Sequence, residues 1–374
     1  MIYSLVKREF LSYFRTPIAY VFLAAFNLLV VGTTFFVGDL LETNQADLNP
    51  FFQILPWLLL VIVPGIGMRV WAQEKATGSI ELLLTLPIKI WQPVVAKFLA
   101  GWLVMAIAIA ITTPLIATIS YLGNPDWGPL ITGYLGGWLM AGAFLAVAGL
   151  CSACSKNQSS AFILAVGANF CMLIIGWGYF GDLLRTVLPE AVVAMLSEGS
   201  VILHYEALGR GVIELTDICY FLLIIATALM LNINLLEAGR INNKAGFRQQ
   251  FGQLKLYRSS LFTFCIATAL FIVSSHVEVR YDLTDSGAYS VSQQSASIVA
   301  DLKKTVTANF YFSQNLKRMP PFINQYAKRV KAILGRLAKE SDGKLQIKVI
   351  NPLPDTEAAD DAIASGIKPV DTRD

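Results

Sequence analysis

Long runs of uncharged residues are the feature that most limits what this chain can fold into. Seven windows occur, each long enough to cross a hydrocarbon layer about 30 Å thick. They lie near residues 17–38, 51–68, 98–122, 129–153, 159–180, 218–236 and 259–275. Inserting a single Asp, Lys or Arg at mid-bilayer costs about 2.5–3.5 kcal/mol on insertion scales. The absence of charged residues from these windows is therefore selective. We therefore predict an all-α polytopic membrane protein with about seven transmembrane helices.

The composition agrees with a membrane protein and excludes other classes. Of the 374 residues, 55% are hydrophobic and 15% are charged, whereas an ordinary soluble domain has roughly 25% charged residues. The net charge of +3 is small and no basic tract occurs, so no nucleic-acid partner is expected. All five cysteines lie in apolar segments, which argues against a disulfide framework.

The distribution of lysine and arginine predicts the orientation in the membrane. Thirteen of them lie before the first window or in 69–97, 154–158 and 237–258, whereas the alternate loops carry two. Short cytoplasmic loops accumulate these residues. We therefore expect a cytoplasmic N-terminus and an extracytoplasmic, or periplasmic, C-terminal domain.

Five segments follow from these patterns. They are an interfacial elbow helix (1–16), a six-helix membrane domain (17–240), a cytoplasmic linker (241–258), a seventh transmembrane helix (259–276) and an extracytoplasmic α/β domain (277–374). We also predict that residues 181–216 form one or two short helices that lie at the outer surface and cap the bundle. In the fourth window, small residues recur at multiples of four, at Gly133, Gly137, Ala141, Gly149 and Ala153. Such a stripe favours close helix packing, either within the subunit or between two subunits.

The C-terminal domain shows a strand, helix, strand pattern. "TVTANFYF" (305–312) and "KLQIKVINP" (344–352) alternate like strands, and an amphipathic helix begins after Pro320 and Pro321. This order predicts parallel pairing and a thioredoxin-like beginning, with a further helix after Asp355. The domain contains no cysteine, so a binding or docking role is expected instead of thiol chemistry. Its sheet is expected to be incomplete.

A charged insert, "EKATGSIELLLTLP" (74–87), separates the second and third windows on the predicted cytoplasmic side. Gly78 is expected to break the helix, Ser79 to cap a short new one, and Pro87 to end it. Glu81 falls in the first turn, where a carboxylate suits the helix dipole. Such a short helix, held between two membrane helices, could receive force from a cytoplasmic partner.

This insert resembles the segment through which type-2 ABC exporter permeases contact their ATPase, and residues 74–87 are called the coupling segment below. The matching positions are Glu74, Gly78, Ser79, Glu81, Leu82, Leu83, Thr85 and Pro87. Residues 1 to about 240 are most similar to the permease of the bacterial gliding-motility (Gld) system. Residues 280–313 and 343–352 resemble the start of the Gld auxiliary extracytoplasmic subunit, as in a fusion of the two.

The resemblance implies a transporter subunit in a bacterial inner membrane that is not itself an enzyme. The chain has no G-x-x-x-x-G-K-[ST] phosphate loop, so ATP and Mg²⁺ are expected in a partner ABC ATPase and no cofactor in this chain. A permease homodimer and contact with membrane lipids are also implied. The alternative is a non-transporting mechanotransmission or scaffold subunit of an envelope or gliding machine, contacting a further extracytoplasmic protein. The sequence does not identify a cargo.

Sharper chemical interpretations have less support. Glu74 and Glu81 could form a catalytic carboxylate pair, but no metal ligand or embedded partner lies nearby in the sequence. The two histidines, His204 and His276, lack neighbours at ligand spacing, so no metal site is expected. Asp217, at the start of the sixth window, is interpreted as an interfacial anchor, with a substrate role as the alternative.

Overall fold

The chain forms two compact units, Met1–Leu283 and Thr284–Asp374. The structure, a computed structural model, describes residues 2–15, 17–37, 46–85, 88–175, 199–242, 280–284, 293–313, 321–341, 343–352 and 356–367, with the single residues Phe180, Pro189 and Val192. The predicted seventh transmembrane helix, 259–276, and the linker before it lie almost wholly outside the described residues.

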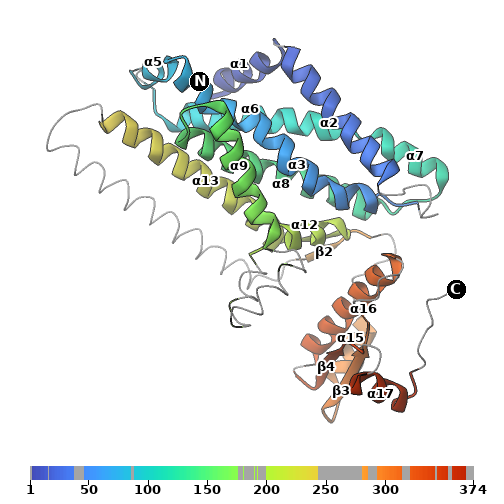
Figure 1. Ribbon diagram of the computed structural model, residues 1–374. Helices are drawn as coiled ribbons and strands as arrows, with labels where there is room; N and C mark the ends of the chain where they lie inside the picture. The colour runs from blue at the N-terminus through green and yellow to red at the C-terminus, as the bar shows by residue number, and fades with distance from the viewer. Residues whose placement is uncertain are drawn as a thin grey trace. The chain divides into compact units, whose positions relative to one another are not determined.

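The first unit is mainly helical (Figure 1). Its helices are α1 (Ile2–Phe14), α2 (Pro17–Phe36), α3 (Asn49–Gly67), α4 (Arg69–Ala76), α5 (Ser79–Thr85), α6 (Trp91–Ala110), α7 (Pro114–Leu122), α8 (Trp127–Cys154), α9 (Gln158–Ile174), α12 (Val201–Gly209) and α13 (Leu215–Asn242). Within the described residues, five helical stretches are long and apolar enough to cross a membrane. They are Ala19–Phe36, Asn49–Ala76, Trp91–Leu122, Trp127–Cys154 and Leu215–Ala238, and Gln158–Ile174 is a shorter apolar helix.

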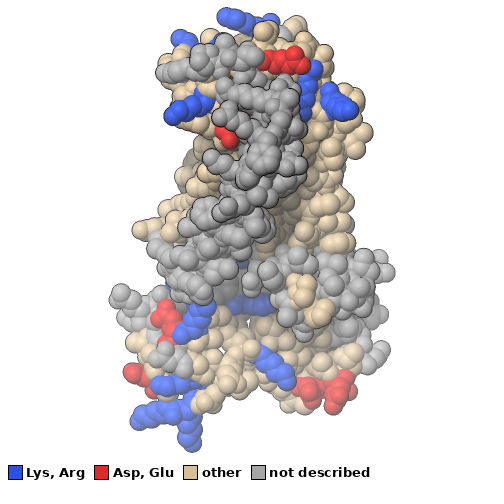
Figure 2. All heavy atoms as spheres, turned by 90° about the vertical axis from the view of Figure 1, so that its left-hand side faces the viewer, with Lys and Arg blue, Asp and Glu red and all other residues tan. Residues whose placement is uncertain are grey.

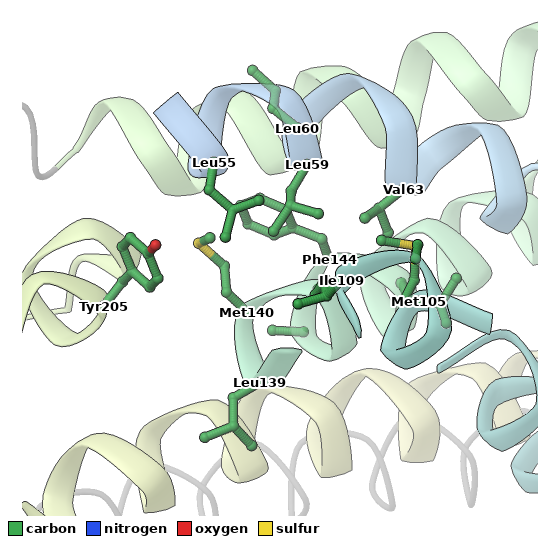
Figure 3. Close-up of a cluster of buried hydrophobic side chains, with 14 of the residues drawn as sticks. Leu55, Leu59, Leu60, Val63, Met105, Ile109, Leu139, Met140, Phe144 and Tyr205 are labelled. Carbon is green, nitrogen blue, oxygen red and sulfur yellow. The ribbon is translucent and has the colours of Figure 1, made fainter. Parts of the chain in front are cut away.

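Helix α8 lies at the centre of the core, with α3, α6, α9, α12 and α13 packed against it. Figure 3 shows Leu59 of α3 and Met140 and Phe144 of α8 pointing toward one another, and none of the three is exposed. Other apolar side chains, such as Leu28 on α2, remain exposed on the outside of the unit. Figure 2 shows Lys and Arg side chains gathered at the end of this unit that carries α1 and α5, above a largely uncharged flank. This distribution is typical of a helix bundle surrounded by lipid.

Two of the long apolar stretches contain a break. Helix α3 includes Pro64 and passes into α4 at Met68, whose amide donates to the Pro64 carbonyl at 2.8 Å. Helix α6 ends at Ala110, and Pro114 begins α7 after a short turn. Proline is tolerated in the first turn of a helix because its missing N–H would have no partner there.

The small residues of α8 pack within the chain. A β-carbon at Gly133 would lie 2.6 Å from the ring of Phe52, and one at Gly137 would lie 2.7 Å from Leu55. Both neighbours belong to α3, so these glycines let α3 approach α8 closely. Of the two interpretations of the stripe, packing within the subunit therefore holds at these positions.

Helix α12 belongs to the 181–216 segment that is predicted to cap the bundle, and it packs onto the bundle. This helix packs against α8, and its residues Val201, His204, Tyr205 and Leu208 are buried. Gly136 of α8 makes room for it, because a β-carbon there would lie 3.1 Å from Leu208. The Tyr205 hydroxyl donates to the Phe52 carbonyl at 3.0 Å.

A short sheet follows α12. Strand β1 (Val212–Glu214) pairs antiparallel with β2 (Arg280–Asp282), in a register that places Ile213 opposite Tyr281. Gly211 has φ +88°, a conformation that favours glycine, and its carbonyl accepts a hydrogen bond of 2.9 Å from the Leu283 amide. The chain just before the second unit is thus bonded to the loop before α13.

The second unit contains the predicted parallel strand pair. Strand β3 (Val306–Tyr311) pairs in parallel with β4 (Leu345–Ile350), and α16 (Pro321–Glu340) connects them. Helix α15 (Gln293–Ala300) precedes β3, and α17 (Glu357–Ala364) follows β4. The parallel pairing, the connecting helix and the last helix are confirmed.

Candidate functional site

The coupling segment folds as two helices joined at a sharp turn. Helix α4 carries Glu74, and α5 begins at Ser79. Gly78, between them, has φ +71°, and apart from its chain neighbours no atom of the described residues lies within 4 Å of where its β-carbon would be. Backbone conformation, not lack of space, therefore favours glycine here.

The hydrogen bonds described for Ser79 run back toward α4, and none of them caps α5 as the sequence predicts. Its hydroxyl donates to the Glu74 carbonyl at 3.4 Å and lies 2.9 Å from the Thr77 hydroxyl oxygen. The Thr77 hydroxyl also donates to the Gln73 carbonyl at 3.1 Å. These bonds help to satisfy the last carbonyls of α4, a need that the sequence interpretation overlooked.

Helix α5 has one packed face and one exposed face. Ile80 and Leu83 pack against a small apolar cluster made of Trp71, Ile90, Val94, Ala153 and Leu236. Glu81 is exposed, and Leu82 is 72% exposed. The side chain of Thr85 and the whole of Pro87 lie outside the described residues.

Glu9, Glu74 and Lys97 form a charged cluster at the base of the coupling segment. The Lys97 ammonium lies 2.7 Å from Glu74 Oε1 and 3.3 Å from Glu9 Oε2. The three side chains are 11–22% exposed, so water screens them only partly. Lys97 Nζ also lies 5.5 Å from the ring centre of Trp71, within cation–π range. One lysine of α6 thereby holds together α1 and α4.

The pKa of Glu9 reports this arrangement. Burial, the largest influence, raises the pKa of the Glu9 carboxyl, but Lys97 and Arg8 together outweigh it. The resulting pKa lies below the ordinary value of 4.5. Glu9 is therefore ionised at neutral pH and contributes its charge to the cluster.

Ser152 of α8 bridges the break between α3 and α4. Its hydroxyl oxygen accepts from the amides of Trp71 and Ala72, at 3.0 and 2.9 Å, and its proton is donated to the Met68 carbonyl at 2.8 Å. Lys75 Nζ donates to the carbonyls of Ala153 and Ser155 at the end of α8, where a cation suits the helix dipole. The base of the coupling segment is thus fixed to α8 as well.

A second polar site lies at the start of α13. His204 Nδ1 and Asp217 Oδ1 are 2.6 Å apart, and both residues are buried. The Tyr220 ring stacks on the His204 ring at 4.0 Å between centroids, and its hydroxyl donates to the Gly199 carbonyl at 2.6 Å. The interpretation of Asp217 as an interfacial anchor is therefore wrong, because its partner is a buried histidine. Two ionisable residues in apolar surroundings were the signal that could have identified the pair.

Neither site resembles a metal centre. Within the described part of the chain, no group of three or more His, Cys, Asp or Glu could hold a metal ion. Glu74 and Glu81 also do not form a carboxylate pair: Glu74 is bonded to Lys97, and Glu81 is exposed on α5. The geometry favours mechanical attachment over chemistry at these residues.

Comparison with known proteins finds two family models that together match most of the chain. The model described as ABC-2 family transporter protein matches residues 11–285. A domain of unknown function, DUF7088, matches residues 285–374. Among curated proteins, no significant match is found.

Proposed function

Since the chain belongs to the ABC-2 family of transporter proteins, we propose that it is the permease subunit of an ABC exporter and receives force through its coupling segment. A partner ATPase would bind and hydrolyse ATP with Mg²⁺, and its motion would act on α5. The membrane helices would then change between two arrangements around a path for substrate. Members of this family are membrane subunits that work with an ATPase subunit.

One observation carries this proposal: α5 is exposed on one face while its base is fixed to three other helices. Leu82 and Glu81 are exposed to solvent, whereas Ile80 and Leu83 pack inward. The charged cluster and Ser152 connect α4 to α1, α6 and α8. A surface turn without a mechanical role would need none of these attachments.

Further parts of the proposal rest on the resemblance and the charge pattern. We propose a bacterial inner-membrane location with the N-terminus in the cytoplasm, and a homodimer of this chain with two ATPase subunits, since two-fold symmetry is the commonest arrangement. Glu74, Gly78, Ser79, Glu81, Leu82, Leu83, Thr85 and Pro87 would contact the ATPase. The segments 1–16, 17–240, 241–258, 259–276 and 277–374 would be the elbow helix, permease, linker, seventh crossing and thioredoxin-like outer domain of a Gld-type fusion.

Co-purification with the ATPase tests the main proposal. The full chain is expressed with the ABC ATPase from a neighbouring gene, and the ATPase recovered with it is measured. Glu81→Arg and Leu82→Asp should each reduce the recovered ATPase at least tenfold. Glu340→Arg is the matched control, because it reverses the charge of an exposed glutamate on α16 in the second unit. Equal recovery in all variants would remove α5 as the contact.

The sidedness of the coupling segment has a separate test. Thr77 is exposed, so a Thr77→Cys variant should react with a membrane-impermeant thiol reagent. The background variant lacks Cys154 and Cys171, both of which are exposed thiols. We expect labelling only after the cells are opened. Labelling from outside intact cells would place the segment on the wrong side for an ATPase.

The β1–β2 sheet favours the second candidate function, in which ATP-driven motion does mechanical work on the outer domain. Residues 280–282 precede the second unit, and their ladder to residues 212–214 joins them to the start of α13. Because α13 is long enough to cross the membrane, pairing its beginning with β2 requires the chain to return to the same side. This supports the predicted seventh crossing. It also means that a movement of α13 could reach the outer domain through the hydrogen bonds between β1 and β2.

Breaking this ladder distinguishes the two functions. Proline at Ile213 removes a backbone donor and destabilises the three-residue pairing. If the protein exports a substrate, Ile213→Pro should leave ATP-dependent transport into inverted vesicles nearly unchanged. If it transmits force outward, ATPase activity should persist while the cellular function of the outer domain is lost.

A further inference from the structure

A small cavity lies between the base of the coupling segment and the last permease helix. Its walls include Trp71 of α4, Phe98 of α6, Gly149 of α8 and Asn232 of α13. Its volume of about 10 Å³ is at the lower limit for one water molecule. Gly149 helps to keep this space, since a β-carbon there would lie 3.5 Å from Asn232 Nδ2.

Two polar atoms on residues lining this cavity are buried without a hydrogen-bond partner among the described residues. They are Trp71 Nε1, a donor, and Asn232 Oδ1, an acceptor. Trp71 is 0% exposed and Asn232 is 2% exposed, so bulk water does not reach them. A buried polar group without a partner carries its full desolvation penalty, and native proteins rarely leave one in that state.

We propose that this cavity binds one water molecule, which accepts from Trp71 Nε1 and donates to Asn232 Oδ1. The two residues come from α4 and α13, far apart in the sequence, yet both line this cavity, and one has an unpaired donor and the other an unpaired acceptor. Water is the ligand that fits both roles and the small volume. The other lining residues, including Phe98 and Leu145, are apolar and provide no charge to hold an ion.

The bound water joins the base of the coupling segment to α13. It can turn and keep both hydrogen bonds while the two helices shift slightly, whereas a direct hydrogen bond would stretch. The inference rests on buried polar atoms and a cavity, and it holds whether or not the chain exports a substrate.

A double-mutant cycle on the full chain in detergent tests the proposal. Trp71→Phe and Asn232→Leu each remove one polar partner, and the thermal unfolding midpoint is measured for each and for the double variant. With a bridging water, each single change leaves the other group unsatisfied and lowers the midpoint. The double variant should then fall by less than the sum of the single falls. The matched control pairs Asn232→Leu with Trp138→Phe, whose indole donates directly to the Trp102 carbonyl, and should be additive.

A direct measurement keeps the proposal testable if a variant fails to fold. A density map of the unmodified protein, at a resolution that shows ordered water, should contain a peak within hydrogen-bond distance of both Trp71 Nε1 and Asn232 Oδ1. Additive effects in the cycle, or a well-resolved cavity without such a peak, would overturn the proposal.

Discussion

Replacing Lys97 by methionine should weaken the attachment of the coupling segment and reduce the stability that the protein loses in acid. At an effective dielectric constant of about 20, unit charges at 2.7 and 3.3 Å attract by roughly 6 and 5 kcal/mol before desolvation is counted. Breaking a buried pair costs about 3–5 kcal/mol and an exposed pair about 1 or less. Exposures of 11–22% lie between these limits, so we expect a net loss of about 2–3 kcal/mol.

The pH dependence gives this prediction its sign. In the unmodified protein the pKa of Glu9 is lowered, so its ionised form stabilises the fold above pH 4.5 and that stability is lost as the pH falls through the lowered pKa. Without Lys97, only Arg8 opposes the effect of burial, so the pKa of Glu9 should be higher than in the unmodified protein. The Lys97→Met variant should therefore lose less stability than the unmodified protein as the pH falls below about 4.5.

Thermal unfolding of the full chain in detergent at several pH values measures both effects. A loss of about 2–3 kcal/mol corresponds to a midpoint lowered by roughly 3–5 °C for a unit of this size. Lys97→Arg keeps the charge and should retain most of the stability. Adding Glu74→Gln to Lys97→Met should recover part of the loss. An unchanged midpoint in Lys97→Met, or an equal loss in Lys97→Arg, would refute the role given to the charge.

Three further predictions concern the packing and the buried polar sites. Gly67→Ala should lower the free energy of unfolding by about 1–3 kcal/mol, because the new β-carbon would lie 2.4 Å from the β-carbon of Ala148. Gly167→Ala is the control, since its β-carbon would have open space and should leave the melting midpoint unchanged or raise it. Ser152→Ala should lower the midpoint by leaving two amides and a carbonyl unsatisfied, a loss of about 1–3 kcal/mol that an unchanged midpoint would contradict. Asp217→Leu should lower the free energy of unfolding by about 1–3 kcal/mol. Asp217→Asn should lower it clearly less, because the amide can still form a hydrogen bond with His204. Equal losses in the two variants would count against the pair.

The membrane helices are the part of the fold that the sequence predicts best. A bilayer requires about 20 apolar residues in a row, so α2, α3, α8 and α13 leave a signal that depends only on neighbouring residues. The end of α12 and the strand β1 leave no such signal. Strand β1 has three residues, and its partner β2 is more than sixty positions away. Strand β1 forms only because a distant part of the chain lies beside it, and the hydrophobic periodicity of a sequence does not predict such pairing.

The candidate site divides in the same way. The motif around Gly78 and Glu81 is local, and its helix, turn and exposed face could be predicted from adjacent residues. The partners of Glu74 could not, because Lys97 and Glu9 reach it from other helices and any of the nearby cations could have served. Ser152 was also missed, since a serine in an apolar helix usually bonds to its own preceding turn. Here the break at Met68 presents unsatisfied amides, and those amides give Ser152 its partners.

If α5 receives force as proposed, its packing explains how that force would pass the turn at Gly78. The turn at Gly78 is exposed and unpacked, so a push on α5 would be absorbed there if that turn were its only connection. Ile80 and Leu83 prevent this, because they press α5 against the cluster that includes Trp71 and Leu236. In the proposed function, force on the exposed face would therefore enter α4, α8 and α13 through packed side chains. Close-packed interiors transmit such displacements with little compression, whereas a single backbone turn does not.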